Sequence, residues 1–208
     1  MAEAYIIDTV RTAVGRRGGA FHDVHPADLG AHALTALVER TGVDPAAVED
    51  VVFGCLDAIG PQAGDIARTC WLAAGLPEEV PGTTVDRQCG SSQQAVHFAA
   101  QGVMSGTQDL VVAGGVQNMS MIPISSAMTV AEQFGFTDPF SSSKGWTARY
   151  GNEEISQFRA AQMIADHWKV TRDEMEDFAV ESHRRAVQAI DASRDRSGSP
   201  RLRLWAAR

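Results

Sequence analysis

The sequence predicts an α/β protein with a mostly parallel β-sheet, and three observations support this prediction. Short apolar runs alternate along residues 1–120 with longer segments of helical periodicity. The runs read as buried strands, which is typical of a sheet that is covered on both faces. Glycine and proline residues separate the segments where turns are required. Strands that alternate with helices imply crossover connections and a layered α/β domain.

Four strands and three helices are expected in this part of the chain. The strands are expected at residues 5–7, 51–55, 83–86 and 110–113, and the helices at residues 26–41, 62–75 and 91–104. Pro26 suits the first turn of its helix, because its missing N–H is not needed there. Gly42 suits the C-terminal stop of the same helix. The predicted α/β domain therefore spans residues 1–120.

The character of the chain changes after residue 120. An irregular segment rich in proline, glycine and serine precedes two strong helical patterns at residues 153–168 and 171–190, with Thr171 as the cap of the second. We interpret residues 121–191 as a separate, mainly helical lobe inserted into the α/β domain. Residues 192–208 are rich in arginine and serine and lose apolar periodicity, so we expect an aberrant, disordered tail.

Composition excludes several classes of partner. The net charge of −8 disfavours nucleic acid and anionic membrane as main partners. Three dispersed cysteines without a secretion signal indicate a reducing cytoplasm. Neither the cysteines nor the six histidines have the spacing of a metal site, so no metal is expected.

The segment DRQCGSSQQA, residues 86–95, is the sharpest chemical signal in the chain. It places Cys89 between a predicted strand and the N-terminus of an apolar helix that we expect to be buried. Unpaired amides at such a terminus stabilise a thiolate and an oxyanion, which makes Cys89 and Gly90 the candidate nucleophile and oxyanion site. Gly90 also leaves room for a substrate beside the backbone. The competing interpretation is an inert cysteine, since lone cysteines are usually buried core residues.

Four blocks in order resemble the signatures of the thiolase family. They are VRTAVGRRGGAF (10–21), PQAGDIAR (61–68), LAAGLPEEVPGTTVDRQCGSS (72–92) and VVAGGVQNMS (111–120). The resemblance implies a thiolase-like layered fold in which Cys89 is acylated by a 3-ketoacyl-CoA or an acyl-CoA. Coenzyme A is then a substrate, and no separate cofactor is expected. The interpretation of Cys89 as inert loses most of its weight beside four ordered blocks.

The resemblance also assigns the helical lobe as the loop domain that covers CoA. Ser156, Gln157 and Phe158 align with the segment that lines the pantetheine tunnel, and they stand where acetoacetyl-specific relatives have His-Met-Gly. This difference favours thiolytic cleavage of another 3-ketoacyl-CoA, and the sequence as a whole resembles thiolases of lipid or sterol breakdown. Gln117, where many relatives have Glu, supports no functional conclusion.

The resemblance further implies that this chain is the N-terminal half of a thiolase and lacks the C-terminal domain. The family takes its acid/base residues from Gly-His-Pro and Cys-Gly-Gly motifs, and neither occurs in these 208 residues. We therefore expect the chain alone to be inactive, and the full-length protein to be a homodimer or homotetramer. The arginine- and serine-rich tail resembles the product of a shifted reading frame.

Three other functions remain open at this point. A ketoacyl synthase relative would share the fold and the cysteine, although the blocks at residues 61–68 and 114–120 favour a thiolase. A non-catalytic thiolase-like protein that binds CoA or lipid is disfavoured by Cys89, which such proteins often lose. A non-functional gene remnant is also compatible with the sequence.

Overall fold

The structure is a computed structural model that describes residues 3–195. The chain divides into two compact units, residues 1–139 and residues 140–208, which are described separately below. This division lies after the boundary expected at residue 120, and the predicted functional boundaries at residues 120 and 191 remain predictions.

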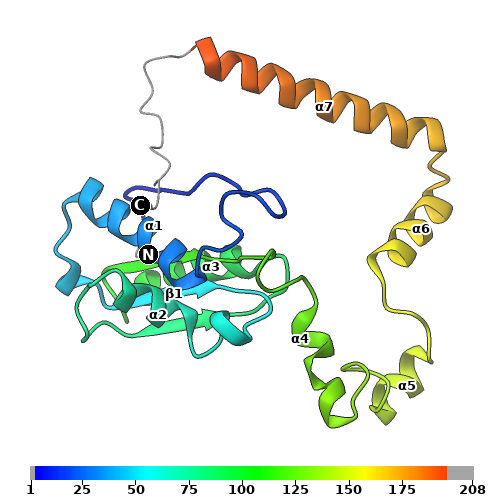
Figure 1. Ribbon diagram of the computed structural model, residues 1–208, viewed down its shortest axis with the longest axis horizontal. Coiled ribbons are helices and arrows are strands. Elements are labelled where there is room, and N and C mark those ends of the chain that lie inside the picture. Colours follow the sequence, from blue (N-terminus) through cyan, green and yellow to red (C-terminus); the bar gives the residue numbers. More distant parts are fainter. Residues whose placement is uncertain (1–2, 196–208) are drawn as a thin grey trace. The chain divides into compact units, whose positions relative to one another are not determined.

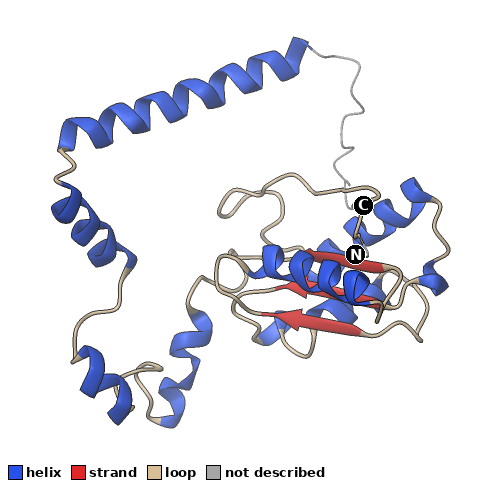
Figure 2. Cartoon of the chain, turned by 180° about the vertical axis from the view of Figure 1, so that it is seen from behind, coloured by secondary structure: helices blue, strands red, loops and turns tan. Residues whose placement is uncertain are grey.

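Three parallel strands form the centre of the first unit (Figures 1 and 2). β1 (Asp50–Gly54) lies between β2 (Gly82–Val85) and β3 (Val111–Gly115). Gly54 pairs with Val85 on one side and with Gly115 on the other, so the three strands end at the same level. The loops that follow the strands therefore leave from one common edge of the sheet. The predicted α/β class and parallel sheet are confirmed.

Helices cover both faces of this sheet. The covering helices are α1 (Pro26–Thr41), α2 (Ile66–Ala73) and α3 (Ser91–Ser105). The first unit also contains α4 (Ser126–Thr129) and the 3₁₀ turns η1 (Pro45–Ala47), η2 (Gly60–Gln62) and η3 (Val130–Phe134). Val51 and Phe53 of β1 point into a cluster formed with α1 and α2, whereas Val52 points into a smaller cluster with Ala95 of α3. Because successive side chains of a strand face opposite sides, one strand serves both layers.

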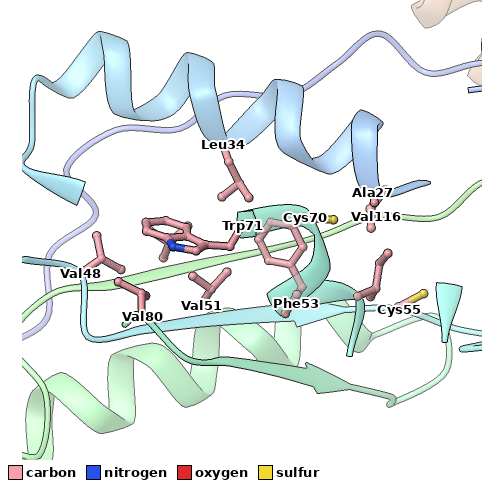
Figure 3. Packing of buried hydrophobic residues seen from close by; sticks show 13 residues of the cluster. Ala27, Leu34, Val48, Val51, Phe53, Cys55, Cys70, Trp71, Val80 and Val116 are labelled. Carbon is pink, nitrogen blue, oxygen red and sulfur yellow. The ribbon is translucent and has the colours of Figure 1, made fainter. Parts of the chain in front are cut away.

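The larger cluster surrounds Trp71, whose side chain lies between α1 and the sheet (Figure 3). Trp71 is fully buried, and its Nε1–H donates to the carbonyl oxygen of Pro77 at 2.8 Å. This bond satisfies the polar atom of the largest side chain in the core. Gly30 allows close contact of α1 with α2, because a Cβ there would lie 2.3 Å from the Sγ of Cys70.

In the first unit, the limits of the predicted helices agree with the structure to within two residues, except at the start of α2. Pro26 occupies the first turn of α1, and Gly42 ends it in the left-handed region with φ 64°. The helix expected at residues 62–75 begins only at Ile66, because Asp65 has a positive φ of 61°. A residue in that region interrupts helical hydrogen bonding, so residues 60–62 form a separate 3₁₀ turn.

The strand expected at Tyr5–Ile7 is absent, and this prediction is wrong. The three side chains are 73–78% exposed, and the segment pairs with none of β1, β2 and β3. A strand needs a neighbour to bond its N–H and C=O groups, and apolar character alone does not supply one.

Helices joined by short irregular segments make up the described part of the second unit. It contains α5 (Lys144–Tyr150), α6 (Gln157–Trp168) and α7 (Arg172–Asp195). Thr171 caps α7 as predicted: its Oγ1 accepts from the Glu174 amide, and the Glu174 carboxylate accepts from the Thr171 amide at 2.8 Å. The predicted tail lies outside the described residues, except that residues 192–195 continue α7. Within residues 3–195, no helix is both long and apolar enough to cross a membrane.

Candidate functional site

Cys89 lies in a tight turn between β2 and α3, as the sequence predicts. The turn begins with Asp86, whose carboxylate accepts from the Gln88 amide at 2.7 Å. Gln88 has a positive φ of 49°, which is uncommon for a residue other than glycine. Ser91 closes the turn, because its Oγ accepts from the Arg87 amide at 2.9 Å and donates to the Gln88 carbonyl oxygen at 2.6 Å. The turn is thus held from both sides, and the side chain of Cys89 is exposed.

The thiol stands at the N-terminus of a helix of 15 residues. Gly90 is the N-cap, and its amide donates to the Arg87 carbonyl oxygen at 3.0 Å. The amides of Ser92 and Gln93, in the first turn of α3, make no hydrogen bond to any residue in the described range. The helix dipole and such amides favour negative charge. The arrangement suits a thiolate or an oxyanion, and the oxyanion role of Cys89 and Gly90 remains a prediction.

The expectation that α3 is a buried helix is wrong. Only one face, formed by Ser91, Ala95 and Ala99, is buried, whereas Phe98 and Met104 are 44% and 52% exposed. The sheet covers one side of the helix, and no part of the described first unit covers the other. The thiol is therefore open to reagents in this chain.

Two glycines bring the start of α3 against the ends of the strands, and sequence reasoning missed them. A Cβ on Gly54 would lie 2.2 Å from the Ser92 amide nitrogen, and one on Gly115 would lie 2.1 Å from the Ser92 Oγ. Any larger residue would push the first turn of α3 away from the sheet. Glycine at the last position of two neighbouring parallel strands is the sequence signal that could have revealed this contact.

The other two thiols have a different environment. Cys55 and Cys70 are buried, and their Sγ atoms lie against carbonyl oxygens of Leu56 and Pro26. Burial raises the pKa of the Cys55 thiol to about 11 and that of the Cys70 thiol to about 12. Both thiols are therefore protonated and sheltered at neutral pH.

Ser156, Gln157 and Phe158 lie at the start of α6, in the second unit. Ser156 is the N-cap, and its Oγ accepts from the Arg159 amide at 3.2 Å. Phe158 is 89% exposed. An exposed aromatic ring beside a capped helix start is available for contact, and the predicted role in CoA binding remains a prediction.

Buried polar groups beyond the ends of β1 and β3 are a second feature that the sequence analysis did not identify. Asp57, Gln62 and Asn118 are 1%, 0% and 6% exposed. Asp57 and Asn118 each follow the end of a strand by three residues, on the edge that also carries Cys89. Among the described residues, no group of three histidine, cysteine or acidic side chains is placed to hold a metal ion.

The chain is similar in sequence to several known proteins. Residues 4–196 match the family model of the thiolase N-terminal domain. The chain is 66% identical over 192 residues to the steroid 3-ketoacyl-CoA thiolase FadA6 of Mycobacterium tuberculosis, covering 92% of this chain and 47% of that protein. It is 38% identical to a beta-ketoadipyl-CoA thiolase of Pseudomonas aeruginosa, covering 91% and 49%.

A 3-oxoadipyl-CoA/3-oxo-5,6-dehydrosuberyl-CoA thiolase of Escherichia coli is 34% identical, with 91% of this chain and 49% of the relative covered. The chain thus spans about half the length of the curated relatives it matches. The matched region contains β2, the tight turn with the exposed Cys89, and α3. The chain belongs to the thiolase family, as a thiolase N-terminal domain.

Proposed function

We propose that this chain supplies the acyl-carrying cysteine of a thiolase that cleaves a 3-ketoacyl-CoA, with Cys89 as the nucleophile. The observation that carries this proposal is the single exposed thiol at the N-terminus of α3. The relatives' names support the substrate class, and the similarity to a steroid 3-ketoacyl-CoA thiolase favours sterol breakdown. We place the reaction in the cytoplasm, because free thiols suit a reducing compartment.

The chemistry proceeds in two steps. The Cys89 thiolate attacks the 3-keto carbon of the substrate, the bond between C2 and C3 breaks, and its electron pair leaves as the enolate of acetyl-CoA, which then takes a proton. The thiolate of a second CoA attacks the resulting thioester, releasing the shortened acyl-CoA and regenerating the Cys89 thiolate. The helix N-terminus favours the charge on sulfur before the attack.

Proton transfer requires groups beyond Cys89. The resemblance assigns them to motifs that do not occur in these 208 residues. We therefore propose that the isolated chain accepts an acyl group and does not turn over, since the loss of a general base typically costs about 10²–10⁴-fold in rate. We also propose CoA contacts at Ser156, Gln157 and Phe158, and a homodimer or homotetramer for the full-length protein.

Acetyl-CoA gives the sharpest test, because acetyl transfer from CoA to a thiolate needs no proton donor. The chain is incubated with acetyl-CoA, and intact-mass and peptide mass spectrometry follow the adduct. We expect one acetyl group on Cys89, an equal release of CoA, and no adduct in Cys89→Ala. The matched control, Cys55→Ala, should be acetylated like the wild type. Acetylation elsewhere, or none at all, would reject the proposal.

The main alternative is a non-catalytic thiolase-like protein that binds CoA or lipid. An exposed cysteine at a helix N-terminus disfavours it, because binding alone does not require a nucleophile there. In the same experiment, this alternative predicts bound acetyl-CoA without a covalent adduct.

A further inference from the structure

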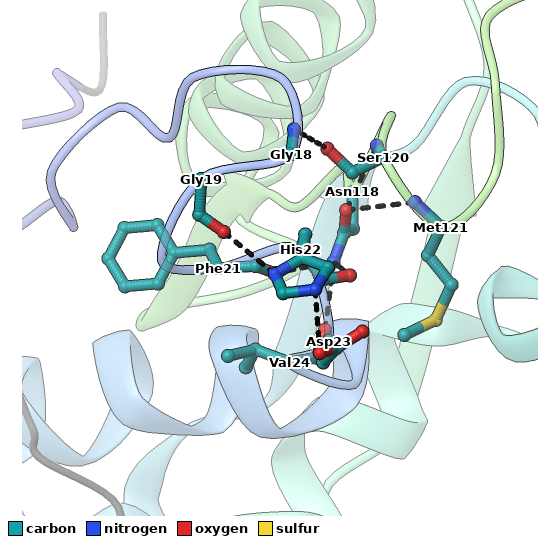
Figure 4. A network of polar contacts seen from close by, with 9 residues as sticks. All are labelled: Gly18, Gly19, Phe21, His22, Asp23, Val24, Asn118, Ser120 and Met121. Atoms are coloured by element: carbon teal, nitrogen blue, oxygen red, sulfur yellow. Dashed lines mark hydrogen bonds and ion pairs between the residues drawn. The ribbon is translucent and has the colours of Figure 1, made fainter.

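The side chain of Asn118 joins two segments that are about a hundred residues apart in sequence. Its Nδ2 donates to the carbonyl oxygens of Phe21 and Val24, both at 2.9 Å (Figure 4). Its Oδ1 accepts from the amides of Ser120 and Met121 at 3.1 and 3.2 Å. Every polar atom of this buried amide is used, so it ties the loop at residues 18–24 to the turn that follows β3.

The side chain of Asp57 holds the segment that leads into α4. Its carboxylate is almost fully buried and accepts from the amides of Ser125 and Ala127 at 3.0 and 2.7 Å. Asp57 has a positive φ of 52°, which the surrounding structure must hold in place. The carboxylate therefore fixes the point at which the chain turns into α4.

Gln62 connects the other two groups. Its Oε1 accepts from the Asn118 amide at 2.9 Å, and its Nε2 donates to the Asp57 carbonyl oxygen at 2.9 Å. The Gln62 side chain thus links the backbones of Asn118 and Asp57, and the three residues form one polar network from the loop at residues 18–24 to α4. Removing one member leaves its hydrogen-bond partners in this network without that bond.

This network lies on the edge of the sheet that also carries Cys89. Gly54 precedes Asp57 and Gly115 precedes Asn118 by three residues each, and both glycines are in contact distance of Ser92 at the start of α3. The network thus follows the ends of β1 and β3, and the helix that begins just after Cys89 packs against the same two strand ends.

From this arrangement we infer that Asn118 and Asp57 are positioning residues of the candidate active site. They hold the segments at residues 18–24 and 120–127 on the edge of the sheet that also carries the turn of Cys89, so that a CoA thioester can reach the sulfur in the productive orientation. The inference rests on the proposed function, because it concerns the acceptance of a CoA thioester. Neither residue is assigned a contact with the reacting atoms.

The test compares two reactions of the same thiol. Iodoacetamide is small and reports the intrinsic reactivity of Cys89, whereas acetyl-CoA also requires an ordered approach. In Asp57→Asn and Asn118→Ala we expect alkylation within about twofold of wild type and acetyl transfer reduced about tenfold, corresponding to about 1.4 kcal/mol. Hydrogen exchange should accelerate at Ser125 and Ala127 in the first variant, and at Ser120 and Met121 in the second.

A control variant lies at the opposite edge of the sheet. Gln108 donates to the Asp50 carboxylate at 3.3 Å, at the amino end of β1, so Gln108→Ala should change neither reaction. Faster exchange with unchanged acetyl transfer would show that the network is only structural and overturn the inference. An equal loss of both reactions would also overturn it. A wild-type chain that is alkylated but never acetylated would instead reject the proposed function itself.

If Asn118→Ala fails to fold, Asp57→Asn and the double variant Asp57→Asn/Gln108→Ala keep the test decisive. Thermal unfolding by circular dichroism identifies a folding failure before the reactions are measured. A folded Asp57→Asn chain that is acetylated at the wild-type rate rejects the inference for Asp57 in either background.

Discussion

The two units of the chain place the same kind of side chain in opposite environments. Trp71, in α2 of the first unit, is fully buried, whereas Trp168, at the end of α6 in the second unit, is 67% exposed. Among the described residues of the second unit none is buried, although α6 and α7 carry regularly spaced apolar residues such as Phe178 and Ile190. Periodicity thus specifies which face of a helix is apolar and leaves open whether anything within the chain covers it.

Local interactions hold the helices of the second unit. Thr171 and Glu174 form a capping box, and Glu181 pairs with Arg184 and Arg185 one turn later. Such pairs contribute about 0.2–0.5 kcal/mol each. A helix of 24 residues also exceeds the roughly 12–15 residues below which isolated helices are marginal. Burial of apolar side chains is thus the main stabilising contribution in the first unit, whereas local helix interactions are the main contribution in the second unit.

Truncation of a large aromatic residue in each unit should show the largest contrast. Trp71→Ala removes a fully buried ring and its bond to Pro77, so we expect a loss of about 3–5 kcal/mol in the free energy of unfolding. Phe178→Ala removes a ring that is 78% exposed and should change the free energy of unfolding by at most about 0.5 kcal/mol. Urea denaturation followed by circular dichroism measures both. Equal losses would show that the second unit has a core of its own.

Alkaline pH should destabilise only the first unit. The pKa of Cys55 rises to about 11 and that of Cys70 to about 12 on burial, against about 8.5 for a free thiol. Above pH 8.5 the unfolded chain loses these protons while the folded chain keeps them, so stability falls as pH rises. The slope is about 1.4 kcal/mol per pH unit for each thiol until its folded pKa is reached.

Urea titrations between pH 8 and 10 measure this slope. Cys70→Ala should reduce the thiol contribution by about half, because one of the two linked groups is gone. Helical signal from the second unit should persist over the same range. A stability that stays constant to pH 10 would contradict the buried, protonated state of both thiols.

Substitution of one glycine in each unit should change the free energy of unfolding by an intermediate amount, with opposite sign in the two units. Gly115→Ala forces a Cβ to within 2.1 Å of the Ser92 Oγ and 2.5 Å of the Gly54 carbonyl oxygen, and should cost about 1–3 kcal/mol. A Cβ added at Gly145, in α5, would meet no atom within 4 Å, so Gly145→Ala should stabilise its helix by up to about 1 kcal/mol. Thermal melts of the two variants provide the comparison. A neutral Gly115→Ala would refute the close seating of α3 on the strand ends.

Loss of the cap of α7 should give the smallest effect. Thr171→Ala removes the oxygen that accepts from the Glu174 amide, at a cost of about 1 kcal/mol to that helix. The hydrogen bonds from Thr171 also lower the pKa of Glu174, so the cap weakens as pH falls through that pKa. Hydrogen exchange of the first turn of α7 should accelerate, and that of β1 should not. Faster hydrogen exchange in both elements would show that the stabilities of the two units are coupled.

Much of the sheet layer could be predicted because its signals are local. Apolar runs bounded by glycine and proline located β1, β2 and β3 to within about a residue or two, and Pro26, Gly42 and Thr171 marked helix ends correctly. The absence of a strand at Tyr5–Ile7 could not be predicted from these residues, because strand pairing depends on a neighbour elsewhere in the chain.

The candidate site divides in the same way. Cys89 and its helix could be found from one contiguous segment, since a strand followed by a cysteine and a helical pattern fixes the geometry of the turn. The network of Asp57, Gln62 and Asn118 depends on contacts across about sixty residues, which the local sequence pattern does not contain. Its members look like ordinary loop residues until their burial is known.

Competitive alkylation of the three thiols tests whether Cys89 is the thiol available for acyl transfer. The chain is treated with limiting iodoacetamide at pH 7, and mass spectrometry measures the labelling rate at each cysteine. Cys89 is exposed at a helix N-terminus, whereas Cys55 and Cys70 are buried with raised pKa values. We therefore predict that Cys89 is labelled first, and that the other two react only on unfolding. Faster labelling of Cys55 or Cys70 in the folded chain would contradict the assignment of Cys89.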